Sequence, residues 1–130
     1  ELAPVEKVYH VKTPAKVDGS CLHQLMEPLV MGGHQAKRVI ETAPAVVQVL
    51  EETQGYTWLE FKIREGRNRQ IRRLCGRSRL PVEVLHRVQF GPLLLGDLAQ
   101  GQSRALTQQE VNLCYELSLP GVKVPTLQRF

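Results

Sequence analysis

Arginines crowd one short segment of the chain, which runs from Glu65 to Leu74 as Glu-Gly-Arg-Asn-Arg-Gln-Ile-Arg-Arg-Leu. The window from Lys62 to Arg87 holds nine of the 17 Lys and Arg residues and two of the 13 Asp and Glu residues, so it carries +7 and the remainder −3. Like charges one helical turn apart repel by roughly 0.2–0.5 kcal/mol per pair, a cost that a bound anion offsets. Because arginine's planar fork binds phosphate or carboxylate through two hydrogen bonds, the segment predicts a polyanionic ligand.

The segment also lies where a predicted strand is followed by a predicted helix, and a helix start offers unpaired backbone N–H groups to a phosphate. Asn68 and Arg69 are placed for such contacts. A helix spreads its side chains around its circumference, and we expect Arg72 to point inward toward a site. The alternative is a solvated amphipathic helix whose arginines pair with Glu60, Glu65 and Glu83.

Alternating residues predict the strands that position this segment. Tyr56 to Arg64 alternates between an apolar face that begins at Thr57 and a polar face, and Lys7 to Lys12 is rich in strand-forming residues. The periodicity then changes to that of a helix over Asn68 to Arg79, with an apolar stripe made by Ile71, Leu74 and Cys75.

The remaining elements are predicted from caps, turns and short apolar runs. They are a helix over about Cys21–Met31, capped by Asp18-Gly19-Ser20 and with Pro28 as a point where it can kink, strands at Val39–Thr42, Val46–Glu51, Val82–Val88 and Leu93–Leu95, and a last helix from the Thr107 and Glu110 capping box to about Leu117.

Short, alternating strands interleaved with helices predict an α+β fold with a mixed, mostly antiparallel sheet and flanking helices. We expect residues 1–119 to be part of one domain and residues 120–130 to be a tail. A chain that starts with Glu and at once reads as a strand suggests a processed or truncated protein.

Composition argues against several classes of protein. The three cysteines are spaced 54 and 39 residues apart and the four histidines are scattered, so we expect free thiols, no metal and no cofactor. No run of 18 apolar residues and no secretion signal is found in the sequence, so we expect no membrane partner and a cytoplasmic location, with an organelle as the alternative.

The arginine segment at 65–74, together with Glu-Lys-Val-Tyr at 6–9 and Leu-His-Arg at 85–87, closely resembles the RsuA-type ribosomal RNA pseudouridine synthases. The resemblance covers most of residues 5–111. It implies an isomerase that needs neither metal nor cofactor, and that detaches uracil from its ribose, rotates it and rejoins it through carbon, with ribosomal RNA as the partner.

The resemblance also implies roles for individual residues. Tyr9 matches the family's tyrosine against the extruded base, although an ordinary strand aromatic is the alternative. Arg72 matches the arginine that pairs with the nucleophilic aspartate, and Ile71 forms an apolar wall. The residues expected to contact RNA are Arg64, Arg67, Asn68, Arg69 and Arg73.

One part of the family pattern is missing from these 130 residues. The nucleophile of the family lies in a Gly-Arg-Leu-Asp segment upstream of the Lys-x-Tyr strand, and no such segment precedes Glu6. The two aspartates present, Asp18 and Asp97, lie in contexts typical of a cap and a loop. We therefore expect a C-terminal part of a synthase that is inactive alone and whose partner is the N-terminal part of the same protein.

Two other classes of function stay open from the sequence. The first is a non-enzymatic RNA-binding or ribosome-assembly module derived from a synthase. The second is a protein that binds an acidic protein partner through the arginine cluster, which competition by RNA would distinguish.

Overall fold

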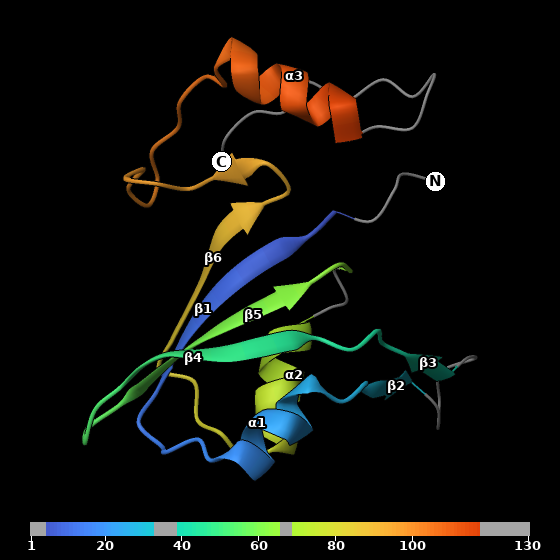
Figure 1. Ribbon diagram of the computed structural model, residues 1–130, viewed down its shortest axis with the longest axis vertical. Coiled ribbons are helices and arrows are strands. Elements are labelled where there is room, and N and C mark those ends of the chain that lie inside the picture. The colour runs from blue at the N-terminus through green and yellow to red at the C-terminus, as the bar shows by residue number, and fades with distance from the viewer. Residues whose placement is uncertain (1–4, 33–38, 66–68, 118–130) are drawn as a thin grey trace.

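The computed structural model describes residues 5–32, 39–65 and 69–117. These residues form a five-stranded sheet in the order β4-β5-β1-β6-β7, a separate two-stranded sheet of β2 and β3, and three helices (Figure 1). The elements are β1 (Lys7–Thr13), α1 (Gly19–Met26), β2 (Val30–Gly32), β3 (Val39–Glu41), β4 (Val46–Glu52), β5 (Thr57–Ile63), α2 (Gln70–Arg77), β6 (Val84–Phe90), β7 (Leu93–Leu94) and α3 (Gln108–Leu117). The α+β prediction is confirmed, and every pairing between described strands is antiparallel.

The middle strand of the larger sheet is β1, which pairs with β5 on one side and β6 on the other. Alternation divides β5 as predicted, because Thr57, Leu59, Phe61 and Ile63 are all buried while the residues between them are half-buried. One face of the sheet is therefore an apolar surface that the helices cover.

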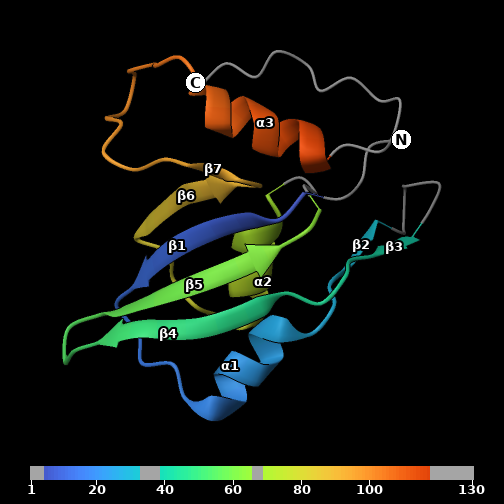
Figure 2. The same cartoon turned by 45° about the horizontal axis from the view of Figure 1, so that its top comes forward.

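Both α1 and α2 lie on this buried face, whereas α3 lies at the opposite end of the molecule, beyond β6 and β7 (Figures 1 and 2). The core unites Leu25 of α1 with Leu74 of α2 and with Leu59 and Phe61 of the sheet. Full burial of each such side chain contributes about 1.5–3 kcal/mol, so the apolar stripe of α2 fixes this helix on the sheet.

The first helix is shorter than predicted. Its start is as expected, since the N–H of Cys21 donates to the Asp18 carboxylate at 2.7 Å. It ends at Met26 instead of about Met31, because Pro28 disfavours a helical conformation at Glu27, whose backbone is extended. Pro28 therefore ends the helix rather than kinking it, and the chain continues into β2.

The second helix is also shorter than the predicted span of 68–79. It is flanked by Arg69 and Arg79, which both have positive φ, at 51° and 56°. At its end the N–H of Leu80 donates to the carbonyl of Cys75 and that of Arg79 to the carbonyl of Gly76, which is a Schellman motif. Arg79 thus occupies a left-handed position that glycine adopts at lower energy.

The capping box of the last helix is confirmed. The N–H of Glu110 donates to the hydroxyl of Thr107 at 3.1 Å, and the N–H of Thr107 donates to the Glu110 carboxylate at 2.9 Å. The same carboxylate accepts two hydrogen bonds from Arg104, at 2.7 and 2.8 Å. The predicted tail at 120–130 lies outside the described residues.

Arg77 differs from its neighbours in the arginine segment because it binds protein backbone. Its guanidinium donates to the carbonyls of Gln24, Glu27 and Pro28 at 2.5–2.9 Å, at the C-terminal end of α1. A cation is favourable there because the last carbonyls of a helix are unpaired and carry partial negative charge. Arg77 therefore joins the two helices that cover the sheet.

We expect Arg77→Met to lower the free energy of unfolding by about 1–3 kcal/mol, because three carbonyls lose a charged donor. Urea denaturation followed by circular dichroism measures this change. The matched control is Arg72→Met on the same helix, where the side chain is exposed and a change within about 0.5 kcal/mol is expected. Equal losses in the two variants would contradict the structural role of Arg77.

Candidate functional site

A cavity of about 420 Å³ lies where the start of α2 faces the ends of β1, β5 and β6. It is lined by Lys7, Tyr9, Ile63, Arg69, Gln70, Ile71, Arg72, Leu85 and Arg87. Three of these residues were predicted to act at a catalytic centre, namely Tyr9, Ile71 and Arg72. Residues far apart in the sequence thus meet at one site.

The strands position Tyr9 through their register. Tyr9 lies opposite Phe61 of β5 and opposite Arg87 of β6, so all three project from the helix-covered face. The ring of Tyr9 is half-buried and packs against the core. It is therefore held at the wall of the cavity and is partly open to solvent.

The helix positions the other two predicted catalytic residues. Ile71 is buried and belongs to the core, as expected for an apolar wall. Arg72, the next residue, lines the cavity but is exposed, so the expectation that it points inward is met only in part. A guanidinium that is buried without a carboxylate is costly, and among the described residues that line this cavity there is no Asp or Glu.

The residues predicted to contact RNA are placed differently from one another. Arg69 is exposed and lines the cavity. Arg64 and Arg73 are exposed and lie outside the set of lining residues. Arg67 and Asn68 fall outside the part of the chain that the structure describes.

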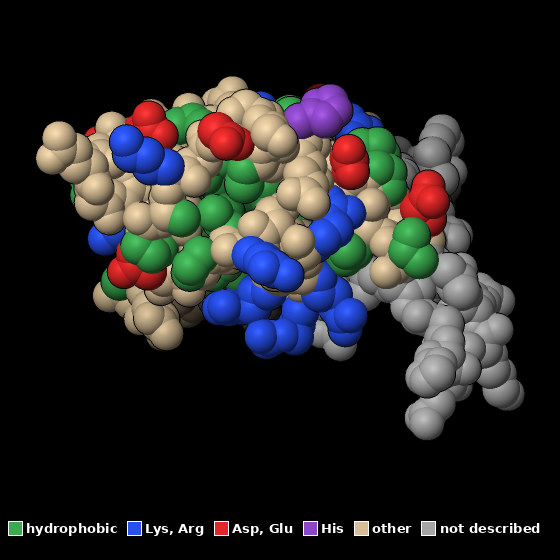
Figure 3. Space-filling model, turned by 90° about the horizontal axis from the view of Figure 1, so that it is seen from below, with side chains coloured by type: hydrophobic (Ala, Val, Ile, Leu, Met, Phe, Trp, Pro, Cys, Tyr) green, Lys and Arg blue, Asp and Glu red, His purple; other side chains and the backbone are tan. Residues whose placement is uncertain are grey.

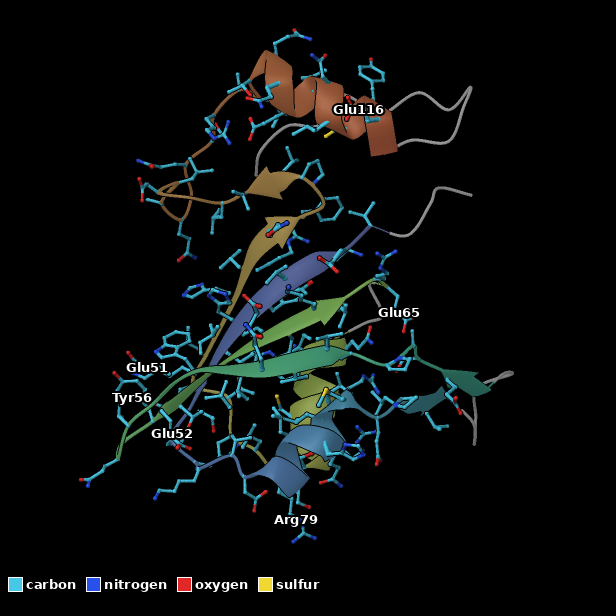
Figure 4. All side chains as sticks on the ribbon, in the orientation of Figure 1. Glu51, Glu52, Tyr56, Glu65, Arg79 and Glu116 are labelled. Atoms are coloured by element: carbon cyan, nitrogen blue, oxygen red, sulfur yellow. The ribbon has the colours of Figure 1, made fainter. Side chains whose placement is uncertain are left out.

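Positive charge gathers on the helix side of the molecule. Seen from below, Lys and Arg side chains gather in a central patch, and others lie apart from it (Figure 3). Glu51 and Glu52 lie beside Tyr56 at the turn between β4 and β5, at the opposite end of these strands from Glu65 (Figure 4). A hydrogen bond with Glu51 raises the pKa of Tyr56, which is typical of an acidic neighbourhood.

The alternative in which surface carboxylates pair with the arginines was expected to involve Glu60 and Glu65, among others. Glu60 lies on the other face of the sheet, where it contacts His10 at 3.3 Å and Lys62 at 3.9 Å. Glu65 accepts a hydrogen bond from the N–H of Ala43 at 2.5 Å. Glu60 is thus joined to neighbouring residues of the sheet, and Glu65 to the loop that precedes β4.

Several lining residues were missed by reasoning from the sequence alone, namely Lys7, Ile63, Gln70, Leu85 and Arg87. The signal for Lys7 was present, because it precedes Tyr9 by two residues on a strand and shares its face. Arg87 becomes a neighbour only through the pairing of β1 with β6, which also contains a register shift between Val8 and Tyr9.

A second cavity, of about 640 Å³, lies between the residues that follow β7 and the helix α3. Its lining includes Asp97, Arg104 and Glu110. Neither Asp97 nor Asp18, which caps α1, is among the residues that line the cavity of Tyr9.

The described residues contain no group of three or more His, Cys, Asp and Glu side chains placed to hold a metal ion. All three cysteines are free thiols, and burial raises the pKa of Cys75 to about 12. Among the helices of the described segments, none has the length and apolar character needed to span a bilayer.

Comparison with known proteins supports the resemblance seen in the motifs, although no family model matches the chain. Ribosomal large subunit pseudouridine synthase B of Pseudomonas aeruginosa is 32% identical over an alignment 116 residues long, which covers 85% of this chain and 29% of that protein. Ribosomal large subunit pseudouridine synthase E of Xanthomonas campestris pv. campestris is 34% identical over an alignment 108 residues long, which covers 75% of this chain and 57% of that protein.

A solved crystal structure of pseudouridylate synthase matches with a TM-score of 0.67 and 27% sequence identity, over 83% of this chain and 44% of that one. The chain therefore spans less than two thirds of each of these three proteins. Sequence similarity and a shared fold agree with the arginine motif at 65–74: the chain belongs to the RsuA-type pseudouridine synthase family.

Proposed function

We propose that this chain is part of the catalytic domain of an RNA pseudouridine synthase, and that ribosomal RNA is its substrate. The observation that carries the proposal is that Tyr9 and Arg72, from a strand and a helix far apart in the sequence, line one cavity. Ribosomal RNA as substrate implies the compartment in which ribosomes are assembled, the cytoplasm or an organelle.

Tyr9 holds the target uracil in this proposal. A uridine must leave its stack before its glycosidic bond can react, at a cost of a few kcal/mol. Stacking on an aromatic ring returns about 1–3 kcal/mol per base. The half-buried ring of Tyr9, with the apolar side chains of Ile63, Ile71 and Leu85 lining the same cavity, suits a planar base.

Arg72 holds the carboxylate of the nucleophile. An adjacent guanidinium lowers the pKa of a carboxyl group and keeps it charged for attack on the sugar. The exposed position of Arg72 at the cavity supports a partner that arrives from outside the described residues. The two aspartates of the chain lie at other places, Asp18 as the cap of α1 and Asp97 at the second cavity.

In this proposal the 130 residues bind RNA but do not convert uridine to pseudouridine on their own. A tritium-release assay on ribosomal RNA fragments with labelled uridine is expected to give no release above background with the purified chain. Turnover by the chain alone would contradict the proposed division of the active site between this chain and a Gly-Arg-Leu-Asp segment.

The second candidate function is a non-enzymatic RNA-binding or ribosome-assembly module, for which the exposed arginines Arg69, Arg72 and Arg73 would serve equally well. Both functions require salt-sensitive RNA binding, so affinity alone does not separate them. Sequence of the gene upstream of Glu1 does separate them, since Gly-Arg-Leu-Asp encoded there supports the enzyme and its absence supports the module.

The arginines should divide into catalytic and binding residues in a complete enzyme that includes the nucleophile. Arg72→Ala is expected to abolish turnover, because the nucleophile loses its partner. Arg73→Ala is expected mainly to weaken RNA binding and to reduce its salt dependence by about one phosphate contact. Single-turnover kinetics and binding over a range of salt concentrations measure the two effects, and equal effects of both variants would refute the division.

The two left-handed arginines permit a test that separates stability from binding. A left-handed conformation costs an L-residue roughly 1–2 kcal/mol, so Arg69→Gly and Arg79→Gly should each keep or raise the free energy of unfolding. Only Arg69→Gly removes a charge from the cavity, and it should weaken RNA binding several-fold while Arg79→Gly changes it little. Fluorescence anisotropy with a labelled RNA decides this, and a larger loss for Arg79→Gly would count against the assigned RNA contact.

A further inference from the structure

The cavity of Tyr9 is lined by more cations than the proposed nucleophile would contact. Among the nine described residues that line it, four are Lys or Arg, namely Lys7, Arg69, Arg72 and Arg87. A carboxylate paired with Arg72 would engage one of them. The others offer charge-assisted hydrogen bonds to a further anionic group of a ligand.

Lys7 and Arg87 form a pair within this set. They come from the adjacent strands β1 and β6, and both lie against the ring of Phe90, with Nζ of Lys7 at 5.5 Å and Cζ of Arg87 at 5.2 Å from its centroid. Contact with the same aromatic ring restrains both cations. They are near enough for the charge of Arg87 to act on Lys7.

The pKa of Lys7 reflects the burial and the charges around it. Burial lowers the pKa of Lys7, and the nearby charge of Arg87 lowers it further, while Glu65 opposes the shift. An anion bound between the two cations would reverse the effect of Arg87 on Lys7. The pair thus has the properties of a binding site for a negatively charged group.

The position of the pair relative to Tyr9 indicates which anion it is. Lys7 precedes Tyr9 by two residues on the same face of β1, which is about 7 Å along a strand, and Arg87 lies directly across from Tyr9 on β6. A base stacked on Tyr9 brings its own backbone phosphates to this distance. A phosphodiester offers two unbridged oxygens, one for an ammonium and one for a guanidinium.

We propose that Lys7 and Arg87 together bind the backbone phosphate of the extruded uridine, as a contact distinct from those of the exposed arginines on α2. The inference rests on the proposed function, because it takes the RNA strand as the source of the phosphate. The pair fixes the nucleotide at its backbone while Tyr9 holds the base, so the two contacts together position the sugar.

The test removes single charges from the protein and from the RNA, separately and together. It uses the 130-residue chain and a short single-stranded RNA that contains one uridine. Lys7→Gln and Arg87→Gln remove the two cations. Lys12→Gln is the matched control, since it removes the same charge from the same strand but from the opposite face, where Lys12 lies 4.8 Å from the ring of Tyr56. In the RNA, an uncharged methylphosphonate replaces each phosphate in turn, and fluorescence anisotropy gives the dissociation constants.

Among the modified RNAs, the one whose phosphate next to the uridine is neutral should bind the wild-type chain about 3- to 10-fold more weakly than unmodified RNA does. The reason is that one charge-assisted contact is lost. Lys7→Gln and Arg87→Gln should show a similar loss with unmodified RNA and no further loss with that modified RNA. Lys12→Gln should remain as sensitive to the modification as the wild type. Thermal unfolding of each variant confirms that the fold is retained, and the modified RNAs test the site without changing the protein at all.

Two results would overturn the inference, and they differ in what else they refute. The first result is that the chain binds RNA but the protein variant and the RNA modification lower the affinity independently, so that their fold-losses multiply. In that case Lys7 and Arg87 do not contact that phosphate, and the proposed function still stands. If the wild-type chain does not bind RNA, or inorganic phosphate competes as well as RNA does, then the RNA-binding function fails together with the inference.

Discussion

The seating of α2 on the sheet is the constraint on which the candidate site depends. Its apolar stripe of Ile71, Leu74 and Cys75 is buried against the core strands, and Arg77 binds the end of α1 from the same helix. These contacts fix both the position of the helix and its rotation about its own axis. As a result the residues just before and within its first turn face Tyr9.

Electrostatics then decides what the site requires. The helix and the strands bring four cations to a cavity whose described lining contains no Asp or Glu. Such a site remains stable while its guanidinium groups stay hydrated, which agrees with the exposure of Arg69 and Arg72. The proposed function accounts for these cations, because a nucleophilic carboxylate and the RNA phosphates are the anions that they would hold.

The sequence predicted those features that depend on local patterns. The alternation of β5, the cap at Asp18 and the capping box of Thr107 with Glu110 all depend on residues a few positions apart, and all are confirmed. The predicted end of the first helix was wrong. Pro28 disfavours a helical conformation at the residue before it, so the helix ends at Met26.

The features that the sequence did not predict depend on contacts between distant segments. Charge pattern cannot distinguish Arg77, which binds the backbone of α1, from Arg73 one turn earlier, because both read as basic positions on a helix. Arg87 enters the site only through the pairing of β6 with β1, whose register shift beside Tyr9 has no signal in the sequence. Local motifs therefore pointed to Tyr9, Ile71 and Arg72, which line one cavity, and the fold was needed to find the other residues of its lining.

The central claim is that the guanidinium of Arg72 lowers the pKa of a catalytic carboxylate that lies outside these 130 residues. The most direct measurement is an NMR titration of this carboxyl group in a complete enzyme that contains the chain and the Gly-Arg-Leu-Asp segment, compared with its Arg72→Gln and Arg72→Lys variants, because a titration needs no turnover. The proposed function predicts that Arg72→Gln raises the pKa of the carboxyl group, which loses the charge that lowered it, and that Arg72→Lys raises it less. A carboxyl pKa that is the same in the enzyme and in both variants would contradict the proposal.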